Sequence, residues 1–125
     1  MTENEIAKIV VDLCIKIHRV LGPGLLESVY EAALVYKLKK LGLKVTSQVG
    51  VPLVYDEITI EVGFRADVIV DDRVIIELKS VESLNPVHKK QLLTYLRLSG
   101  KKLGLLVNFN VELMKDGITR IANGL

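Results

Sequence analysis

The chain has 125 residues, of which half are hydrophobic and 26% are charged, a composition typical of one globular domain with a modest core. Its 17 lysines and arginines exceed its 15 acidic residues by two, so its charge neither demands nor excludes a nucleic-acid partner. The single cysteine, Cys14, excludes an intramolecular disulfide and a zinc site built from cysteines. The N-terminus lacks a basic signal-peptide start, and no apolar run reaches membrane-spanning length. We therefore expect a cytoplasmic protein without a membrane partner.

Two helices are predicted at the start of the chain. Apolar residues recur at helical spacing over residues 3–21, and Thr2 with Glu5 resembles a capping box ahead of them. The Gly22-Pro23-Gly24 segment breaks this helix, and a second helix is expected over residues 24–41. The side chains expected to form its buried stripe are Leu25, Val29, Ala32, Ala33 and Tyr36.

Three β-rich runs follow, at residues 44–55, 58–70 and 74–79. Pro52 inside the first run predicts an irregular or edge strand, because proline cannot donate to a strand ladder. Gly63 marks an expected bend in the second run. Only a short turn segment separates the second run from the third, so the two should form an antiparallel hairpin.

A third helix and a second group of strands complete the chain. Asn85 and Pro86 are typical N-cap and first-turn residues, and the helix should continue to Ser99. The apolar run 103–109 predicts a strand buried on both faces, and residues 118–121 predict a possible short last strand. The order α-α-β-β-β-α-β, with this possible terminal strand, indicates an α/β fold with a mixed central sheet flanked by helices.

Three charged side chains interrupt the expected hairpin: Asp67, Glu77 and Lys79. Two carboxylates that face each other across a strand pair repel unless a positive group lies between them. A hard divalent cation, Mg²⁺ or Mn²⁺, would supply that charge, and so would Lys79. A metal beside an ammonium group suits phosphodiester hydrolysis. For these three residues alone, an ordinary solvated edge with Asp67 as a salt-bridge partner is the simpler alternative.

The register of this hairpin decides whether the three charged residues meet. A loop of residues 71–73 would pair Val70 with Val74. In that register Asp67 lies opposite Glu77, whereas a two-residue loop would place the two carboxylates on opposite faces of the sheet. We predict the first register, because it collects six apolar side chains on one face: Ala66, Val68, Val70, Val74, Ile76 and Leu78.

Residues 18–31 contain Gly24, Glu27 and Tyr30 at a spacing that resembles the signature of the GxxExxY protein family, grouped within the PD-(D/E)XK nuclease-like superfamily. Later segments resemble further blocks of that family, in the same order: Arg65-Ala66-Asp67, Glu77-Leu78-Lys79, residues 91–96 and residues 104–109. Ala66 stands where the superfamily has a proline. The resemblance implies a restriction-endonuclease-like core, α-β-β-β-α-β, in a single domain of residues 1–125.

The same resemblance implies metal-dependent nuclease chemistry. It implies Asp67, Glu77 and Glu27 as ligands of Mg²⁺ or Mn²⁺, with Lys79 acting at the attacking water. Gln91 and Tyr95, one helical turn apart, resemble a Q-x-x-x-Y element that supports the site or contacts substrate.

For three further side chains near these motifs, a structural or solvent-exposed position is an alternative to a role in the site. Tyr30 is expected to pack with its hydroxyl hydrogen-bonded, which supports the site rather than performing chemistry. His88, at the start of the third helix, faces either a phosphate or solvent. His18, beside the apolar stripe of the first helix, is expected to be a structural histidine.

We expect a Mg²⁺-dependent nuclease that hydrolyses DNA or RNA as a homodimer, because one small domain offers little surface for gripping a duplex. The alternative is a non-catalytic module that retains the nuclease fold and binds nucleic acid or protein. A third possibility is a subunit-interaction module, in which the apolar run 103–107 extends a sheet across a dimer. The absence of tryptophan and an aromatic content of 5% disfavour a platform for stacking single-stranded bases.

Overall fold

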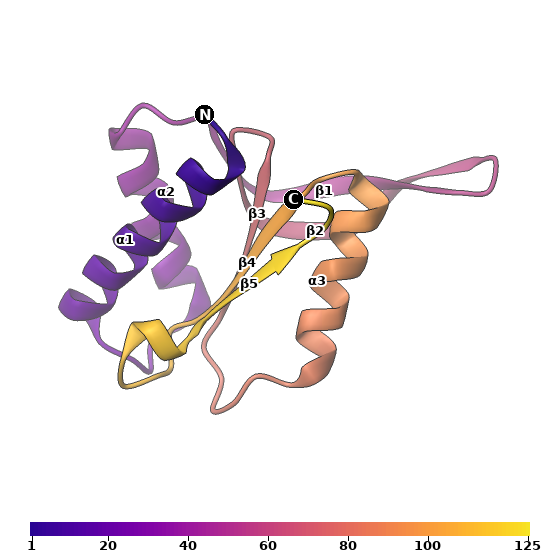
Figure 1. Ribbon diagram of the computed structural model, residues 1–125. Coiled ribbons are helices and arrows are strands. Elements are labelled where there is room, and N and C mark those ends of the chain that lie inside the picture. Colours follow the sequence, from indigo (N-terminus) through magenta and orange to yellow (C-terminus); the bar gives the residue numbers. More distant parts are fainter.

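The computed structural model describes residues 1–125 as a five-stranded sheet between two helical layers (Figure 1). The strands lie in the order β1-β2-β3-β4-β5, and only β3 and β4 are parallel, so the predicted mixed sheet is confirmed. Helices α1 and α2 cover one face and α3 covers the other. The elements are α1 (Glu3–Leu21), α2 (Glu27–Lys40), β1 (Val45–Tyr55), β2 (Ile58–Val70), β3 (Val74–Lys79), α3 (Pro86–Ser99), β4 (Leu103–Asn108), the short 3₁₀ helix η1 (Met114–Asp116) and β5 (Ile118–Ala122).

Helix α1 has the predicted bounds and the predicted capping box at Thr2. Helix α2 begins at Glu27, three residues later than expected, because Gly24 has a φ of +91° and Leu26 is an extended N-cap. The predicted buried stripe of α2 is wrong: Leu25, Val29 and Tyr36 are exposed. The Tyr30 ring instead stacks on Phe109 at 4.2 Å, which turns residues 30, 34 and 38 toward the sheet.

Each face of the sheet carries its own apolar core. The larger core lies under α1 and α2, and the smaller lies under α3. Strand β4 is buried along its whole length, as the apolar run predicted. Its second edge pairs with β5, from Leu103 opposite Ala122 to Val107 opposite Ile118. The idea that residues 103–107 extend a sheet across a dimer is therefore wrong, because no backbone edge of β4 is free.

The β2–β3 hairpin has the predicted register, with Val70 opposite Val74 and Val68 opposite Ile76. Its loop accommodates two consecutive residues of positive φ, Asp71 and Asp72, a conformation that aspartate tolerates better than most side chains. The expected apolar face is correct except for Ala66, which packs in the α3 core. The ladder between β2 and β3 ends at Val68, and upstream of it β2 turns away from β3.

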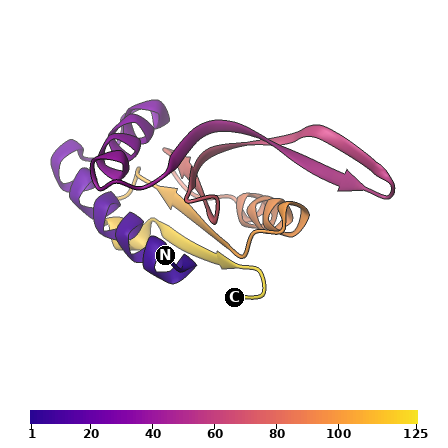
Figure 2. The same cartoon turned by 90° about the horizontal axis from the view of Figure 1, so that it is seen from above.

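Strands β1 and β2 continue beyond the sheet as a projecting hairpin, which we call the arm and define as residues 53–62 (Figures 1 and 2). At its base the pairing shifts, so that residues 61–63 all lie opposite Pro52. A Cβ atom at Gly63 would overlap the Leu53 side chain, so the close approach of β1 and β2 at this point needs a glycine. The irregularity expected at Pro52 and the bend expected near Gly63 are both present.

Candidate functional site

Asp67 of β2 and Glu77 of β3 face each other where the ladder between their strands ends. Asp67 Oδ2 accepts a hydrogen bond from the Leu78 backbone N–H at 2.9 Å. Glu77 Oε1 accepts one from the Asp67 backbone N–H at 3.4 Å. Neither carboxylate takes part in an ion pair. The strands therefore separate around two neighbouring negative groups, and backbone N–H groups are the main donors to them.

The pKa of Glu77 reflects this shortage of positive charge. Burial of the carboxyl group, followed by the negative charge of Asp67, raises its pKa from 4.5 to about 8. The charge of Lys79 opposes the shift only in part. When no cation lies beside it, Glu77 is therefore largely protonated at neutral pH, and a cation placed beside Asp67 and Glu77 would favour the ionised pair.

Glu27, the first residue of α2, reaches the carboxyl end of β3. Its Oε2 accepts a hydrogen bond from the Ser80 backbone N–H at 3.0 Å, and Ser80 Oγ donates to the Leu25 carbonyl at 2.7 Å. These bonds attach the start of α2 to the residue that follows Lys79. Lys79 itself is half-buried and forms no ion pair within the protein. The elements thus bring Glu27, Asp67, Glu77 and Lys79 to one end of β3.

The donor chemistry of this end of β3 fits a hard divalent cation. Asp67 and Glu77 each keep one carboxylate oxygen that no backbone N–H occupies, and hard cations prefer such oxygen ligands. No three side chains among His, Cys, Asp and Glu already converge on one point. Glu27 is instead directed to Ser80, so a third carboxylate ligand would need a rotation of its side chain.

Two residues that border the site, Glu31 and Gln48, are not among the predicted site residues. A cavity of about 430 Å³ is lined by Glu27, Ser28, Glu31, Gln48, Asp67 and Leu78. Gln48 Nε2 donates to Glu31 Oε1 at 2.7 Å and to Asp67 Oδ1 at 3.4 Å. Glu31 could have been found from its position one helical turn after Glu27. Nothing in the sequence marks Gln48, which has a φ of +51° and lies between the paired residues Ser47 and Val49.

Of the residues predicted on α3, only Tyr95 has a described interaction with Glu77. The Tyr95 ring stacks on Phe64 at 3.8 Å, and burial followed by the charge of Glu77 raises the pKa of its hydroxyl. Gln91 is exposed one turn earlier on the helix. His88 has a local role, because its Nδ1 accepts a hydrogen bond from the Asn85 backbone N–H and completes the helix cap.

Tyr30 has the expected supporting geometry. Its side chain is fully buried, and its hydroxyl donates to the Gly22 carbonyl at 2.6 Å and accepts from the Leu25 N–H at 3.1 Å. These bonds fix the loop that leads into Glu27. Tyr30 therefore positions the start of α2 and does not reach the carboxylates of Asp67 and Glu77 through any hydrogen bond.

Replacing Tyr30 with phenylalanine is expected to lower the free energy of unfolding by about 1–2 kcal/mol, since two part-buried backbone groups lose their partner. Urea denaturation would measure the loss. Tyr36→Phe is the matched control, because Tyr36 is 61% exposed and its hydroxyl makes no hydrogen bond. Equal stability of Tyr30→Phe and Tyr36→Phe would contradict the structural role of the Tyr30 hydroxyl.

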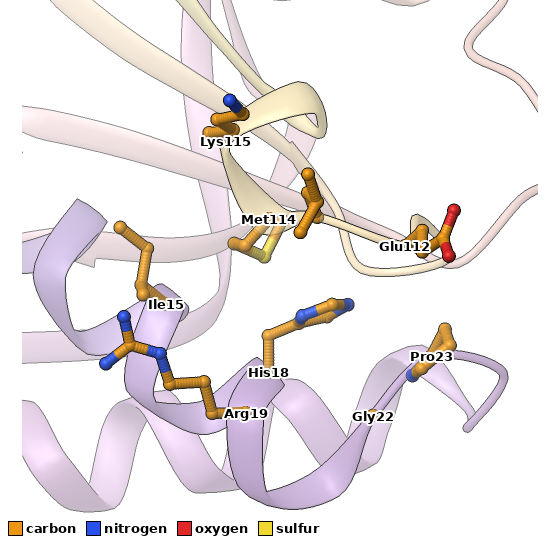
Figure 3. A pocket seen from close by; sticks show the side chains of 9 residues that line it. Ile15, His18, Arg19, Gly22, Pro23, Glu112, Met114 and Lys115 are labelled. Carbon is orange, nitrogen blue, oxygen red and sulfur yellow. The ribbon is translucent and has the colours of Figure 1, made fainter.

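A second cavity of about 470 Å³ lies where α1 meets the loop after β4 (Figure 3). His18 lies beside it, but its Nε2 is within hydrogen-bonding distance of the Val111 carbonyl at 2.7 Å. This contact accounts for the buried imidazole, as expected for a structural histidine. The cavity holds neither a carboxylate pair nor a free nucleophile, so the end of β3 remains the candidate site.

The fold and site together define a restriction-endonuclease-like protein. The structure resembles the crystal structure of an alkaline exonuclease (LHK-Exo) from Laribacter hongkongensis, with a TM-score of 0.52 and 20% sequence identity. The match covers 98% of this chain and 72% of the exonuclease chain. The sequence profile described as the PD-(D/E)XK nuclease superfamily matches residues 4–121, so the chain belongs to this superfamily. A comparison with curated proteins finds no match.

Proposed function

We propose that this protein is a metal-dependent nuclease of the GxxExxY branch, which hydrolyses phosphodiester bonds of DNA or RNA with Mg²⁺ or Mn²⁺. The observation that carries the proposal is the carboxylate pair of Asp67 and Glu77, half-buried, unpaired by any cation and adjacent to Lys79. Membership of a nuclease superfamily supports the same chemistry. The superfamily generally uses divalent metals, which is consistent with this oxygen-rich site.

Each proposed site residue has a distinct role. Asp67 and Glu77 would hold the cation, and Glu27 would join them after leaving Ser80. When bound, the cation polarises the phosphoryl group and makes a coordinated water more acidic. Lys79 donates a hydrogen bond that orients the attacking water and stabilises negative charge as it develops. Tyr95, whose hydroxyl senses the charge of Glu77, and Gln91, one turn earlier on α3, would support the site or contact the substrate.

The α3 side also offers positive charge for a phosphate backbone. Its helix and the turn after it carry basic side chains with no carboxylate among them: Lys89, Lys90, Arg97, Lys101 and Lys102. Cations of this kind bind phosphates without reading sequence, and binding through them weakens as salt is raised. A nucleic acid lying along α3 would bring a phosphate toward Glu77 and Lys79.

Three broader predictions accompany this function. Residues 1–125 are proposed to fold as one nuclease-like domain, and two copies are proposed to act as a homodimer, so that two sites can address a duplex. The expected cytoplasmic location stays a prediction. No helix in the structure has the length and apolar character to cross a membrane.

Cleavage of labelled linear, single-stranded and branched DNA and RNA, with and without Mg²⁺ or Mn²⁺, tests the proposal. Wild type should cleave at least one substrate only when metal is present. Asp67→Asn should lose that activity, because it removes a carboxylate charge from the pair. Asp12→Asn makes the same change on the exposed face of α1 and should leave cleavage intact.

If no substrate is cleaved, a measurement of metal binding distinguishes a missing substrate from a missing metal site. A folded protein that binds Mn²⁺ through Asp67 and Glu77 but cleaves nothing would retain the metal site and limit the proposal to substrates outside the panel. A folded protein that neither binds Mn²⁺ nor cleaves would overturn the nuclease and favour the alternative, a binding module that retains the fold. Mn²⁺ binding is measured by calorimetry on wild type beside Asp67→Asn.

A further inference from the structure

The arm exposes apolar side chains that nothing in the chain covers. Val54, Tyr55 and Val62 are each 60% exposed, and Ile58 is 62% exposed. The tip pairs only with itself, Tyr55 opposite Ile58 across the turn. A two-stranded hairpin alone is marginally stable in water, and a contiguous exposed apolar surface usually marks an interaction site. The arm therefore needs a partner.

The charge of the arm limits which kinds of partner it can bind. It carries three carboxylates, Asp56, Glu57 and Glu61, and no lysine or arginine. The rest of the chain has all 17 basic residues and 12 acidic ones, a net charge of +5. An acidic arm repels the phosphates of nucleic acids and of anionic lipids. It complements a surface that is apolar and basic.

The chain itself has such a surface, a groove of about 270 Å³ between α1 and α2. Its lining is apolar, with Val20 83% exposed at the rim, and its only charged members are Lys16 and Lys37. The groove thus presents apolar side chains flanked by two ammonium groups. The tip of the arm presents Tyr55 and Ile58 flanking two carboxylates, which is the complementary pattern.

The arm of one molecule cannot fill its own groove. Helices α1 and α2 lie at one end of the molecule, and the tip of the arm lies at the opposite end (Figure 2). Any arm that fills the groove must come from another copy. Two copies related by a two-fold axis would each give an arm and receive one, which closes the assembly as a dimer.

We propose that the arm of each chain docks in the α1–α2 groove of a second copy and that this exchange forms the homodimer. Tyr55 and Ile58 contact the apolar floor of the groove, and Asp56 with Glu57 lies beside Lys16 and Lys37 of the other copy. The inference rests on the homodimer of the proposed function but not on its nuclease activity. Its readout is molecular mass, so loss of cleavage leaves it unaffected.

Charge reversal tests the contact with two complementary variants. The arm variant is Asp56→Lys with Glu57→Lys, and the groove variant is Lys16→Glu with Lys37→Glu. Each variant alone brings like charges together at both contacts of the dimer, so its dimer dissociation constant should rise at least about tenfold. Sedimentation equilibrium over a concentration series measures that constant.

An equimolar mixture of the two variants provides the decisive result. In a mixed dimer the reversed arm meets the reversed groove, and the unchanged arm meets the unchanged groove. The mixture should therefore form dimers with a dissociation constant close to that of wild type, although each variant alone dimerises at least about tenfold more weakly. Lys89→Glu with Lys90→Glu, on α3, makes the same charge change outside the groove and should remain dimeric.

A second pair of variants tests the apolar contact. Ile58→Ser should weaken the dimer about tenfold or more, because it removes an apolar side chain from the contact. Val87→Ser is the control on α3, where a valine is 57% exposed. All these positions are exposed, so far-ultraviolet circular dichroism should show unchanged folding.

The outcomes separate the docking from the dimer itself. If the arm and groove variants dimerise as tightly as wild type, the arm exchange is overturned. The proposed homodimer would then form through another surface. Variants that stay monomeric when mixed would overturn the pairing of this arm with this groove. Wild type that is monomeric throughout the series would overturn both the arm exchange and the proposed homodimer.

Discussion

Substitution of Lys79 by methionine is expected to reduce the rate of cleavage by about 10²–10⁴-fold. Lys79 is half-buried beside Glu77 and forms no ion pair in the protein, so its ammonium group is available to water and substrate. Methionine keeps the length and apolar stem of the side chain but cannot donate a hydrogen bond. The variant should therefore lose the orientation of the attacking water and the stabilisation of developing charge.

Metal binding distinguishes this role from a structural one. Lys79→Met should bind Mn²⁺ at least as tightly as wild type, because it removes a positive charge beside Asp67 and Glu77. Single-turnover cleavage at saturating metal isolates the chemical step. Lys8→Met, on the exposed face of α1, removes the same charge far from the site and should keep the wild-type rate. Unchanged cleavage by Lys79→Met would contradict the proposed role.

Substitution of Glu77 by glutamine is expected to abolish cleavage. It should also remove a pH dependence of the free energy of unfolding. The pKa of Glu77 is about 8 in the folded, metal-free protein, and a glutamate in the unfolded chain titrates near 4.5. Between these values the unfolded state loses a proton that the folded state keeps. The free energy of unfolding contributed by Glu77 is thus fully present below pH 4.5 and falls as pH rises to about 8.

Urea denaturation without metal, from pH 5 to pH 9, measures this effect. Wild type should lose stability as pH rises, whereas Glu77→Gln should be flatter and more stable than wild type above pH 8. The other shifted groups, with lowered pKa values at Glu5 and Asp72 and raised ones at Cys14, Lys44 and Tyr95, are present in both proteins. The difference between the two pH profiles therefore isolates Glu77. Parallel pH profiles for the two proteins would disprove the raised pKa of Glu77.

Added Mn²⁺ should reverse the trend in wild type. Metal ligands must be deprotonated, so binding at Glu77 releases close to one proton below pH 8, and the affinity should rise about tenfold per pH unit there. Calorimetry in buffers of different ionisation enthalpy counts that proton. Glu82→Gln, an exposed carboxylate beyond the end of β3, is the control and should keep the wild-type proton release.

The sequence by itself determined most of the fold and the identity of the acidic pair. Capping residues and periodicity placed α1, β2, β3 and α3 at their observed bounds, because caps and alternation are local properties of the chain. The apolar pattern also chose the β2–β3 register, since a shift of one residue would expose the whole buried face. That register is what brings Asp67 opposite Glu77.

Only the tertiary structure decided how these elements meet. The rotation of α2 follows from the stacking of Tyr30 on Phe109, a contact between residues distant in sequence, so helical periodicity alone selected the wrong stripe. The place of Gln48 beside Asp67 depends on β1 pairing with β2. The raised pKa of Glu77 likewise comes from burial and from a charge on another strand. Burial, ring contacts and charge proximity are properties of the folded chain, because they join residues that the sequence keeps apart.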